Sequence, residues 1–361
     1  MRILHIITSL NIGGAEKLMV DLLPRLKEKR VDVELLLFVG NRTMFYEQLE
    51  KEGVQIHAFS DGGSVYNPKH LWRLYRFLQK NKFDVIHTHN TAPQIFAAIV
   101  SLFLPLNLVT TEHNTTNRRR SWKWYKYIDK WMYNAYSSVI CISNAAEKNL
   151  KEYLGVRDNN VKYLTICNGV DVSKYENTPT PKKDNPRTII TMVAGFRPQK
   201  DQDTLIKAFG QLPKGKFELW LVGDGERRKE LESLAVSEGI YEFTKFWGIR
   251  HDIASILKSS DIIVMSSHYE GLSLSSVEGM SVGKPFIASD VDGLREITDG
   301  AGLLFQHGDY RQLASIILEL TSNMDFYNIV AEKCLQRARQ YDISKMVEGY
   351  IAVYLNLYLN L

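Results

Sequence analysis

Short apolar runs alternate with amphipathic segments along the whole chain. The runs predict buried strands, and the segments between them, whose apolar positions recur at helical spacing, predict helices. The predicted strands are 3–8, 33–38, 85–87, 108–111 and 138–142 in the first half, and 189–194, 217–222, 262–265 and 285–288 in the second half. Strands that alternate with helices in this way form parallel sheets covered on both faces, so two doubly wound α/β sheets are expected.

The segment between the two sets of strands lacks hydrophobic periodicity. Residues 175–187 are rich in proline and charge, which is typical of a domain linker. We therefore expect an N-terminal domain over 1–174 and a C-terminal domain over 188–343. The amphipathic segment 344–361 is expected to form a helix that packs back on the N-terminal domain.

The composition is that of a soluble globular protein, with 45% hydrophobic and 24% charged residues. Cys141, Cys167 and Cys334 have neither metal-site nor disulfide-framework spacing, so a reducing cytoplasm is the expected setting. The longest apolar stretch, 95–109, is interrupted by Pro105 and is too short to cross a bilayer. The N-terminal apolar segment is too short for a signal peptide and is interpreted as a buried strand.

Two glycines, Gly13 and Gly14, lie between the first predicted strand and a predicted helix. Glycines at such a turn let backbone N–H groups approach a phosphate, and the helix N-terminus adds partial positive charge. The alternative is a tight turn that needs glycine for its shape alone. The spacing is not G-x-G-x-x-G, and no acidic residue is placed to bind a ribose, which argues against a dinucleotide-dependent dehydrogenase.

A second loop follows the strand predicted at 262–265 and carries Glu270 and, eight residues later, Glu278. The loop opens a predicted helix, so the two carboxylates can face one site. The N–H groups of 272–274 at the start of this helix can hold a diphosphate. Glu278 can accept hydrogen bonds from both hydroxyls of a ribose. Two solvated glutamates beside a helix are the alternative.

The spacing of Glu270 and Glu278 resembles the E-x7-E motif of the retaining family 4 glycosyltransferases. The resemblance spans nearly the whole chain. It also includes Gly13-Gly14 and residues 111–114, 196–200, 221–225 and 291–296. It implies the GT-B fold, in which two Rossmann-like α/β domains, one for the acceptor and one for the donor, face each other across a cleft.

The resemblance implies a retaining, metal-independent transferase that needs no cofactor. The expected donor is a nucleotide-diphosphate hexose or N-acetylhexosamine, with UDP-sugars favoured and GDP-mannose next. The expected acceptor is a lipid-linked glycan in bacterial surface polysaccharide synthesis. A nucleotide-sugar epimerase or hydrolase on the same fold is one rival interpretation, and a non-catalytic scaffold associated with the membrane is another.

The resemblance also assigns roles to single residues. Glu270 resembles the residue near the donor sugar hydroxyls and the reacting centre. His113 resembles the histidine that contacts the transferred sugar, with a core histidine as the alternative. These two are the expected catalytic residues. The expected donor-binding residues are Gly13, Gly14, Arg197, Lys200, Gly223, Gly248, Ile249, Gly271, Leu272, Ser273, Leu274 and Glu278.

Arg197 and Lys200 resemble the basic pair that neutralises the donor diphosphate as it leaves. The family's arginine directly follows a strand and would align with Gly195, so Arg197, two positions later, is the candidate here. Residues 246–250 align with the segment that holds the nucleotide base. In this family the leaving diphosphate is described as helping to deprotonate the acceptor on the same sugar face, so no covalent nucleophile is assigned.

Two features with metal-binding side chains are interpreted as structural. Asp201 and Asp203 fit a D-x-D pattern, but they lie where a helix begins, and N-capping explains them. His87 and His89 lie at a strand end, but no third ligand is indicated and one of the two is expected to point away. No metal is therefore expected.

Residues 118–133 combine basic and aromatic side chains in one segment. Trp124, Tyr127, Ile128 and Trp131 fall at helical spacing and form one apolar stripe. Such a segment suits an anionic lipid interface, so peripheral contact with the inner face of the cytoplasmic membrane is expected. A stripe that packs on the core is the alternative, and nucleic acid is not an expected partner because no nucleic-acid module accompanies the segment. The expected membrane or acceptor contacts are Arg118, Arg119, Arg120, Trp122, Lys123, Trp124, Lys126, Tyr127, Lys130 and Trp131.

Overall fold

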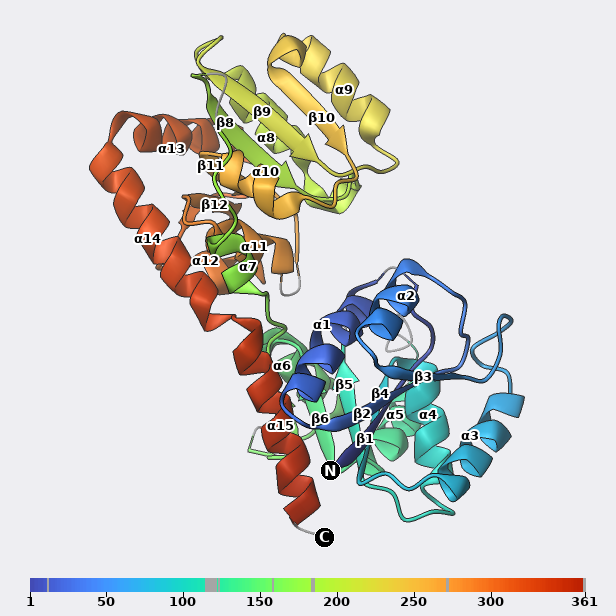
Figure 1. The fold of residues 1–361 in the computed structure, drawn as a ribbon. Helices are drawn as coiled ribbons and strands as arrows, with labels where there is room; N and C mark the ends of the chain where they lie inside the picture. The colour runs from blue at the N-terminus through green and yellow to red at the C-terminus, as the bar shows by residue number, and fades with distance from the viewer. Residues whose placement is uncertain are drawn as a thin grey trace. The chain divides into compact units, whose positions relative to one another are not determined.

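The chain forms two compact units, each built on one parallel sheet (Figure 1). The computed structural model describes residues 1–11, 13–113, 122, 124–157, 159–182, 186–270 and 273–359. The N-terminal unit comprises Met1–Asn168 and Ser344–Leu361, and the C-terminal unit comprises Gly169–Ile343. The predicted fold class, two doubly wound α/β sheets, is confirmed. Among the helices within the described residues, none is long and apolar enough to cross a membrane.

The sheet of the N-terminal unit has seven parallel strands over its described residues, in the order β3-β2-β1-β4-β5-β6-β7. Its strands are β1 (Arg2–Ile7), β2 (Asp32–Leu37), β3 (Gln55–Ala58), β4 (Val85–His89), β5 (Leu108–Glu112), β6 (Ser138–Cys141) and β7 (Tyr163–Thr165). Its helices are α1 (Gly14–Glu28), α2 (Met44–Lys51), α3 (Lys69–Lys80), α4 (Thr91–Val100), α5 (Tyr125–Asn134), α6 (Asn144–Leu154) and α15 (Ile343–Leu359). The strand order reverses between β1 and β4, which is where ligands bind in open α/β sheets.

The sheet of the C-terminal unit has six parallel strands among the residues described, in the order β10-β9-β8-β11-β12-β13. Its strands are β8 (Thr188–Val193), β9 (Phe217–Val222), β10 (Thr244–Gly248), β11 (Ile262–Met265), β12 (Phe286–Ser289) and β13 (Leu303–Phe305). Its α-helices are α7 (Val172–Glu176), α8 (Gln202–Gly210), α9 (Arg228–Ser237), α10 (Ile253–Ser259), α11 (Leu274–Ser281), α12 (Leu294–Thr298), α13 (Tyr310–Ser322) and α14 (Met324–Gln340). Two short 3-10 helices, Pro198–Lys200 and Tyr241–Phe243, complete the unit. Here the strand order reverses between β8 and β11.

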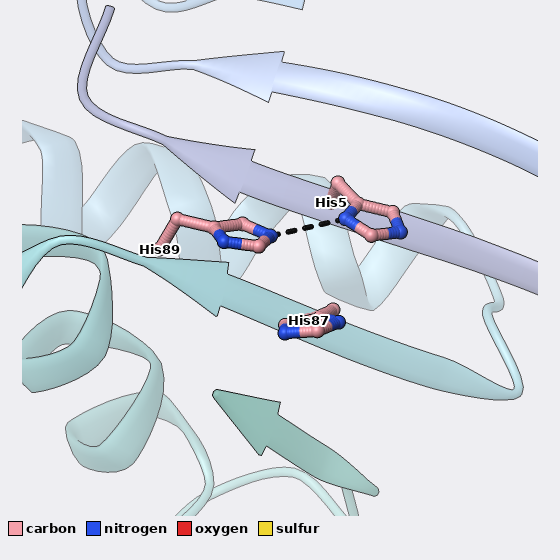
Figure 2. Close-up of side chains that lie close together, drawn as sticks. All are labelled: His5, His87 and His89. Carbon is pink, nitrogen blue, oxygen red and sulfur yellow. Dashed lines mark hydrogen bonds between the residues drawn. The ribbon is translucent and has the colours of Figure 1, made fainter. Parts of the chain in front are cut away.

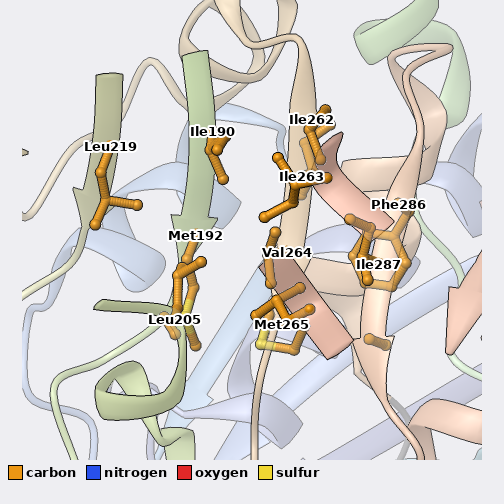
Figure 3. Close-up of a cluster of buried hydrophobic side chains, with 14 of the residues drawn as sticks. Ile190, Met192, Leu205, Leu219, Ile262, Ile263, Val264, Met265, Phe286 and Ile287 are labelled. Carbon is orange, nitrogen blue, oxygen red and sulfur yellow. The ribbon is translucent and has the colours of Figure 1, made fainter. Parts of the chain in front are cut away.

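The core of the C-terminal unit lies on the central strands of its sheet. Ile190, Met192, Ile263 and Val264 are buried on β8 and β11, and Phe286 extends the core onto β12 (Figure 3). These strands are apolar at almost every position because helices cover both faces of a parallel sheet. Burying each such side chain stabilises the fold by about 1.5–3 kcal/mol, which makes this sheet a rigid support for the loops at its edge.

The chain passes from the first unit to the second at Gly169, earlier than the predicted linker at 175–187. Val170 pairs with Asp342 as an isolated parallel bridge, so the chain enters and leaves the C-terminal unit side by side. Val172 and Tyr175 on α7 are buried in the core of that unit. The sequence of 175–187 does not indicate this packing, because Tyr175 is the only described residue of that segment in the core.

Helix α15 packs on the sheet of the N-terminal unit through two fully buried tyrosines, Tyr350 and Tyr354. The hydroxyl oxygen of Tyr354 lies 2.6 Å from Nδ1 of His87, and that of Tyr350 lies 3.2 Å from Oγ1 of Thr111. Buried hydroxyls need such partners, because an unsatisfied one costs about 1–3 kcal/mol. The tyrosines therefore fix the position of the helix on the sheet.

Candidate functional site

The candidate site of the C-terminal unit lies where β8 and β11 end. The loop after β8 carries Arg197 and Lys200, and the loop after β11 carries Glu270. Because β8 and β11 are neighbouring parallel strands, their carboxyl ends lie at the same edge of the sheet. The fold thus brings together residues that are seventy positions apart in the sequence.

Lys200 and Glu270 form an ion pair at this edge. The Nζ of Lys200 donates a hydrogen bond to Oε1 of Glu270, and the Oγ of Ser267 donates a second one at 2.7 Å. The two charged side chains are only 20% and 8% exposed, so water screens their attraction less than at the surface. The pair thus places the carboxylate of Glu270 beside the ammonium group of Lys200, which has two further N–H groups to donate.

Backbone and side-chain hydrogen bonds join the two loops. Gln199 donates from Nε2 to the carbonyl oxygen of Tyr269 at 2.8 Å, and the backbone N–H of His268 donates to the carbonyl oxygen of Gln199, also at 2.8 Å. The hydroxyl of Ser266 donates to the carbonyl oxygen of Asp201 at 2.7 Å. These contacts hold Lys200 and Glu270 in a fixed relation.

Helix α11 begins directly after the second loop, and its N-terminus points its backbone N–H groups at this edge. Its N-cap is Ser273, whose side chain makes no capping hydrogen bond within the described residues. Leu274 is the first helical residue, and Glu278 lies one turn further along, partly exposed. The predicted ligands Gly271 and Leu272 lie outside the described residues. Gly279 lets the helix approach the sheet, because a Cβ there would lie 2.9 Å from a methyl group of Ile263.

The side chain of Arg197 lies close to position 195, where the family's arginine would align. A Cβ built on Gly195 would lie 3.9 Å from Nε of Arg197. The guanidinium stem of Arg197 therefore occupies space close to that of a side chain at 195. Arg197 itself is exposed, so its charged group faces solvent at the same edge as Lys200.

The glycines of the neighbouring loops allow close backbone approach. Gly223 has a φ of +137°, and a Cβ there would lie 2.1 Å from the carbonyl oxygen of Ala194. Its N–H donates to the carbonyl oxygen of Gly248 at 2.9 Å, and Gly248 has a φ of +66°. The side chain of Ile249 is 75% exposed, which leaves the backbone of this segment accessible for a ligand.

The D-x-D pattern is part of a helix start and an ion pair. Asp201 caps α8, since its carboxylate accepts hydrogen bonds from the backbone N–H of Thr204 at 3.3 Å and from its hydroxyl at 2.7 Å. Asp203 pairs with the guanidinium of Arg227 at 2.7 Å. The capping interpretation of Asp201 is confirmed. Asp201 nevertheless lies with His268 and His307 in a group whose ligand atoms are within 4.8 Å of one another, which the sequence pattern did not indicate.

The candidate site of the N-terminal unit lies at the carboxyl ends of β1, β4 and β5. Helix α1 starts at Gly14, and a Cβ added there would have no neighbour within 4 Å among the described atoms. The φ of Gly13 is −168°, an extended conformation open to any residue. Gly14 thus provides open space, whereas a Cβ on Gly13 would lie 2.3 Å from Oε2 of Glu16.

His113 follows β5 at the same edge and is partly buried. Its Nε2 lies 3.0 Å from Nδ1 of His89. Burial lowers the pKa of His113 to about 4, so the ring is neutral at physiological pH. A neutral imidazole has one N–H donor and one lone pair, so His113 can either donate to a sugar hydroxyl or accept from one.

The expectation that His87 and His89 point apart is wrong. Residues two apart on a strand lie on the same face of the sheet, and both rings are fully buried there. His5 on β1 completes a group of three histidines and is the register partner of His87 (Figure 2). The sequence interpretation did not identify His5 as part of this group. The signal was available, because the apolar strand 3–8 is interrupted by a histidine.

The basic aromatic segment begins outside the described residues, where Arg118, Arg119, Arg120 and Lys123 lie. Helix α5 faces the core with Asp129, Met132 and Tyr133. Trp124, Tyr127 and Trp131, by contrast, are 57%, 77% and 41% exposed. The alternative in which the aromatic stripe packs on the core is therefore wrong. Trp122, Lys126 and Lys130, the other described contacts, are exposed or partly exposed near the same helix.

Two family models match adjacent parts of the chain. The model of glycosyltransferase family 4 matches residues 12–174, and the model of glycosyl transferases group 1 matches residues 173–340. An uncharacterized glycosyltransferase of Methanocaldococcus jannaschii is 27% identical and covers 95% of this chain and 94% of its own. The UDP-Gal:alpha-D-GlcNAc-diphosphoundecaprenol alpha-1,3-galactosyltransferase of Escherichia coli is 26% identical and covers 82% of this chain and 81% of its own.

Solved structures agree in fold over the full length. A glycosyltransferase from Rickettsia africae superposes with a TM-score of 0.87 at 19% identity, covering 100% of this chain and 99% of its own. Anabaena Alr3699/HepE in complex with UDP superposes with a TM-score of 0.83 at 22% identity, covering 99% of this chain and 100% of its own. The matched models, the relatives and the two switch-point sites lead to one conclusion. The chain belongs to the group 1 glycosyltransferases and has their GT-B fold.

Proposed function

We propose that this glycosyltransferase moves a hexose or N-acetylhexosamine from a UDP-sugar to a lipid-linked glycan acceptor, with retention at the sugar. The observation that carries the proposal is the Lys200–Glu270 pair beside the N-terminus of α11. This arrangement offers cationic and N–H donors for a diphosphate and a carboxylate for sugar hydroxyls. The name of the E. coli relative, which uses UDP-Gal and a diphosphoundecaprenol acceptor, supports these substrate classes.

In this proposal Lys200 and Arg197 supply the positive charge that stabilises UDP as it leaves. A preformed cation aimed at a developing negative charge is an effective way to lower a barrier, and in this proposal it acts in place of a metal ion. The departing diphosphate accepts the proton of the acceptor hydroxyl on the same face of the sugar. Glu270 binds sugar hydroxyls and remains ion-paired, and His113 contacts the transferred sugar.

UDP is expected to stabilise the protein against heat, whereas GDP and ADP are not. A ligand present at 100 times its Kd stabilises the fold by about 2.7 kcal/mol. Glu278→Ala should remove most of this stabilisation because the ribose loses its acceptor. Differential scanning fluorimetry with each nucleotide measures the effect.

The matched control is Glu319→Ala, which removes an exposed glutamate from α13 of the same unit. It should leave the UDP response intact. Stabilisation by GDP in place of UDP would change the donor assignment. A full UDP response in Glu278→Ala would remove Glu278 from the site.

The proposed transferase and its two rival interpretations differ in how much UDP the protein would release from UDP-sugar. A hydrolase or epimerase would consume UDP-sugar equally with and without acceptor, and a scaffold would bind UDP and turn nothing over. A transferase releases UDP at a rate that depends on the acceptor. UDP release from UDP-galactose, measured with and without a GlcNAc-diphospholipid, therefore separates the three.

We also propose that α5 binds anionic lipid at the inner face of the cytoplasmic membrane. The exposed Trp124, Tyr127 and Trp131 share its solvent face, and Lys130 is exposed between them. Exposed aromatic rings with neighbouring lysines suit a headgroup region, where the rings bury apolar surface and the ammonium groups meet lipid phosphates. A lipid-linked acceptor would then be reached at the surface where it resides.

Replacing Trp124, Tyr127 and Trp131 together with serine is expected to weaken binding to vesicles containing phosphatidylglycerol by at least about tenfold. Sedimentation with vesicles measures this, with phosphatidylcholine vesicles as the uncharged comparison. Trp72→Ser is the control, since this tryptophan is 64% exposed on α3 of the same unit. Equal binding of the triple variant and the control would contradict the proposal.

A further inference from the structure

Three buried histidines form a compact cluster on the central strands of the N-terminal unit. His5 lies on β1, and His87 and His89 lie on the adjacent strand β4, on one face of the sheet (Figure 2). All three rings are 0% exposed. Nothing in the proposed donor or acceptor site uses them directly, yet burying three imidazoles in a strand core costs stability unless their nitrogens are paired.

Contacts between ring nitrogens connect the buried histidines to His113. Nε2 of His113 lies 3.0 Å from Nδ1 of His89, and Nε2 of His89 lies 3.1 Å from Nδ1 of His5. Nε2 of His5 lies 3.3 Å from the hydroxyl of Tyr354 on α15. The candidate catalytic histidine is thus joined, through two buried rings, to a hydroxyl of the C-terminal helix.

The hydroxyl of Tyr354 also contacts the third buried histidine, His87. Tyr354 Oη lies 2.6 Å from Nδ1 of His87, and Nε2 of His87 lies 2.8 Å from Oγ1 of Thr111. Tyr350 Oη lies 3.2 Å from the same Thr111 oxygen. We call His113, His89, His5, Tyr354 and His87 the histidine network.

Ring orientations favour shared hydrogen bonds over a metal ion. The ring planes of His5 and His89 are nearly parallel, with an interplanar angle of 11°, and their nearest nitrogens lie 3.1 Å apart. His87 stacks on both rings, with centroids 4.9 Å from His5 and 4.4 Å from His89. A metal ion bound by three histidines requires a nitrogen lone pair from each ring to point at one position. In stacked rings the lone pairs run parallel to one another and do not meet at one position.

Each ring of the network is neutral. Burial lowers the pKa of His5 to about 3, and it lowers the pKa values of His87 and His89 well below the ordinary value. A neutral imidazole donates from one nitrogen and accepts at the other. Since Nδ1 of one ring meets Nε2 of the next from His5 to His113, a donor on one ring fixes the donor on the next.

Two arrangements pair every contact of the network and also use the hydroxyl proton of Tyr354, and in each of them all four histidines have the same tautomer. If every Nδ1 carries the proton, Tyr354 donates to His5 and accepts from His87, and His113 keeps Nδ1–H for an outside acceptor. If every Nε2 carries the proton, all bonds reverse, and Nδ1 of His113 is a lone pair. The Tyr354 hydroxyl transmits the choice because it has one proton to give.

We infer that His5, His89 and Tyr354 are positioning residues that lock the tautomer of His113 to that of His87, and thereby bias whether His113 donates to or accepts from the transferred sugar. The inference rests on the proposed function for the contact between His113 and the sugar. A histidine whose second nitrogen is held by a partner presents a defined group at the first, as in other histidine sites. Helix α15 thus takes part in the site through Tyr354.

Tyr354→Phe is expected to lower kcat for sugar transfer at least about tenfold, because the tautomer of His113 is then no longer tied to that of His87. Tyr350→Phe is the matched control. It removes a buried hydroxyl from the same helix, one turn away, but Thr111 can still serve His87. Melting temperature and UDP affinity should be similar in the two variants. In a His113→Ala background, Tyr354→Phe should cause no further loss.

Ring-nitrogen NMR of histidine-labelled full-length protein reads the tautomers without any substrate. We expect one shared tautomer at His5, His87, His89 and His113, retained in Tyr350→Phe and mixed in Tyr354→Phe. Different tautomers among the four in the wild type, or equal kcat in the two tyrosine variants, would overturn the inference. Stoichiometric Zn²⁺ binding that is lost in His5→Ala would also overturn it.

The experiment separates this inference from the proposed function. If His113→Ala abolishes transfer and Tyr354→Phe does not change it, the role of His113 stands and the tautomer lock fails. If the tautomers are shared and depend on Tyr354, but His113→Ala transfers sugar at the normal rate, the lock stands and the proposed sugar contact fails.

Discussion

Lys200→Ala is expected to lower kcat by about 100- to 1,000-fold, the loss that follows removal of one preorganised group stabilising a transition-state charge. The Nζ of Lys200 is held by Glu270 at the carboxyl edge of the sheet, largely shielded from water. Alanine leaves the leaving diphosphate without this cation and leaves the 8%-exposed carboxylate of Glu270 with Ser267 but without its ion-pair partner. Steady-state rates of UDP release in the presence of acceptor measure the effect.

The two consequences of Lys200→Ala can be told apart. Glu270→Gln keeps the cation and removes the carboxylate charge, so it should lower kcat while the Kd of UDP changes little. Lys200→Ala should lower kcat and also raise the Kd of UDP. Lys207→Ala, an exposed lysine on α8, is the control and should change neither. A Lys200→Ala enzyme with kcat within threefold of wild type would contradict the assigned role.

The sequence predicted the inner strands of both sheets and missed the outer ones. The strands without a prediction are β3, β7, β10 and β13, and they are the four edge strands. Inner strands are buried on both faces and form apolar runs in the sequence, whereas every position of β3 is exposed or partly exposed. Edge strands therefore lack the pattern on which the prediction depended.

The order of motifs along the sequence indicated a candidate donor site, but it did not show which side chains are in contact. The structure adds the ion pair between Lys200 and Glu270 and the position of Arg197 beside Gly195. The roles of these residues in donor binding stay predictions. The sequence could indicate only local structure, namely a loop that follows a strand and leads into a helix.

The histidine cluster could not be predicted in the same way, because strand register creates it. His5 meets His87 only because β1 pairs with β4 in this alignment, and Tyr354 reaches both from a helix more than 260 positions further along. A shift of one residue would move His5 to the other face of the sheet. The sequence shows three histidines on two strands, and only the fold shows that they share hydrogen bonds.

Gly223→Ala is expected to destabilise the C-terminal unit by roughly 2–5 kcal/mol, because two costs add. The first is a left-handed backbone with a φ of +137°. The second is steric, since the new Cβ would lie 2.1 Å from the carbonyl oxygen of Ala194. Relief requires β8 and β9 to separate where Ala194 donates to Val222 at 2.9 Å. Scanning calorimetry should show a melting temperature lowered by about 5–15 °C.

Gly215→Ala separates the two costs. Gly215 lies in the same unit with a φ of +82°, but an added Cβ would have no neighbour within 4 Å among the described atoms. It should therefore show only the backbone cost, roughly 1–2 kcal/mol. If Gly223→Ala melts no lower than Gly215→Ala, the close approach to Ala194 contributes nothing. If it melts several degrees lower, the contact that sets the path of the loop into Arg197 and Lys200 is a necessary part of the fold, and the variant should also lose its UDP response.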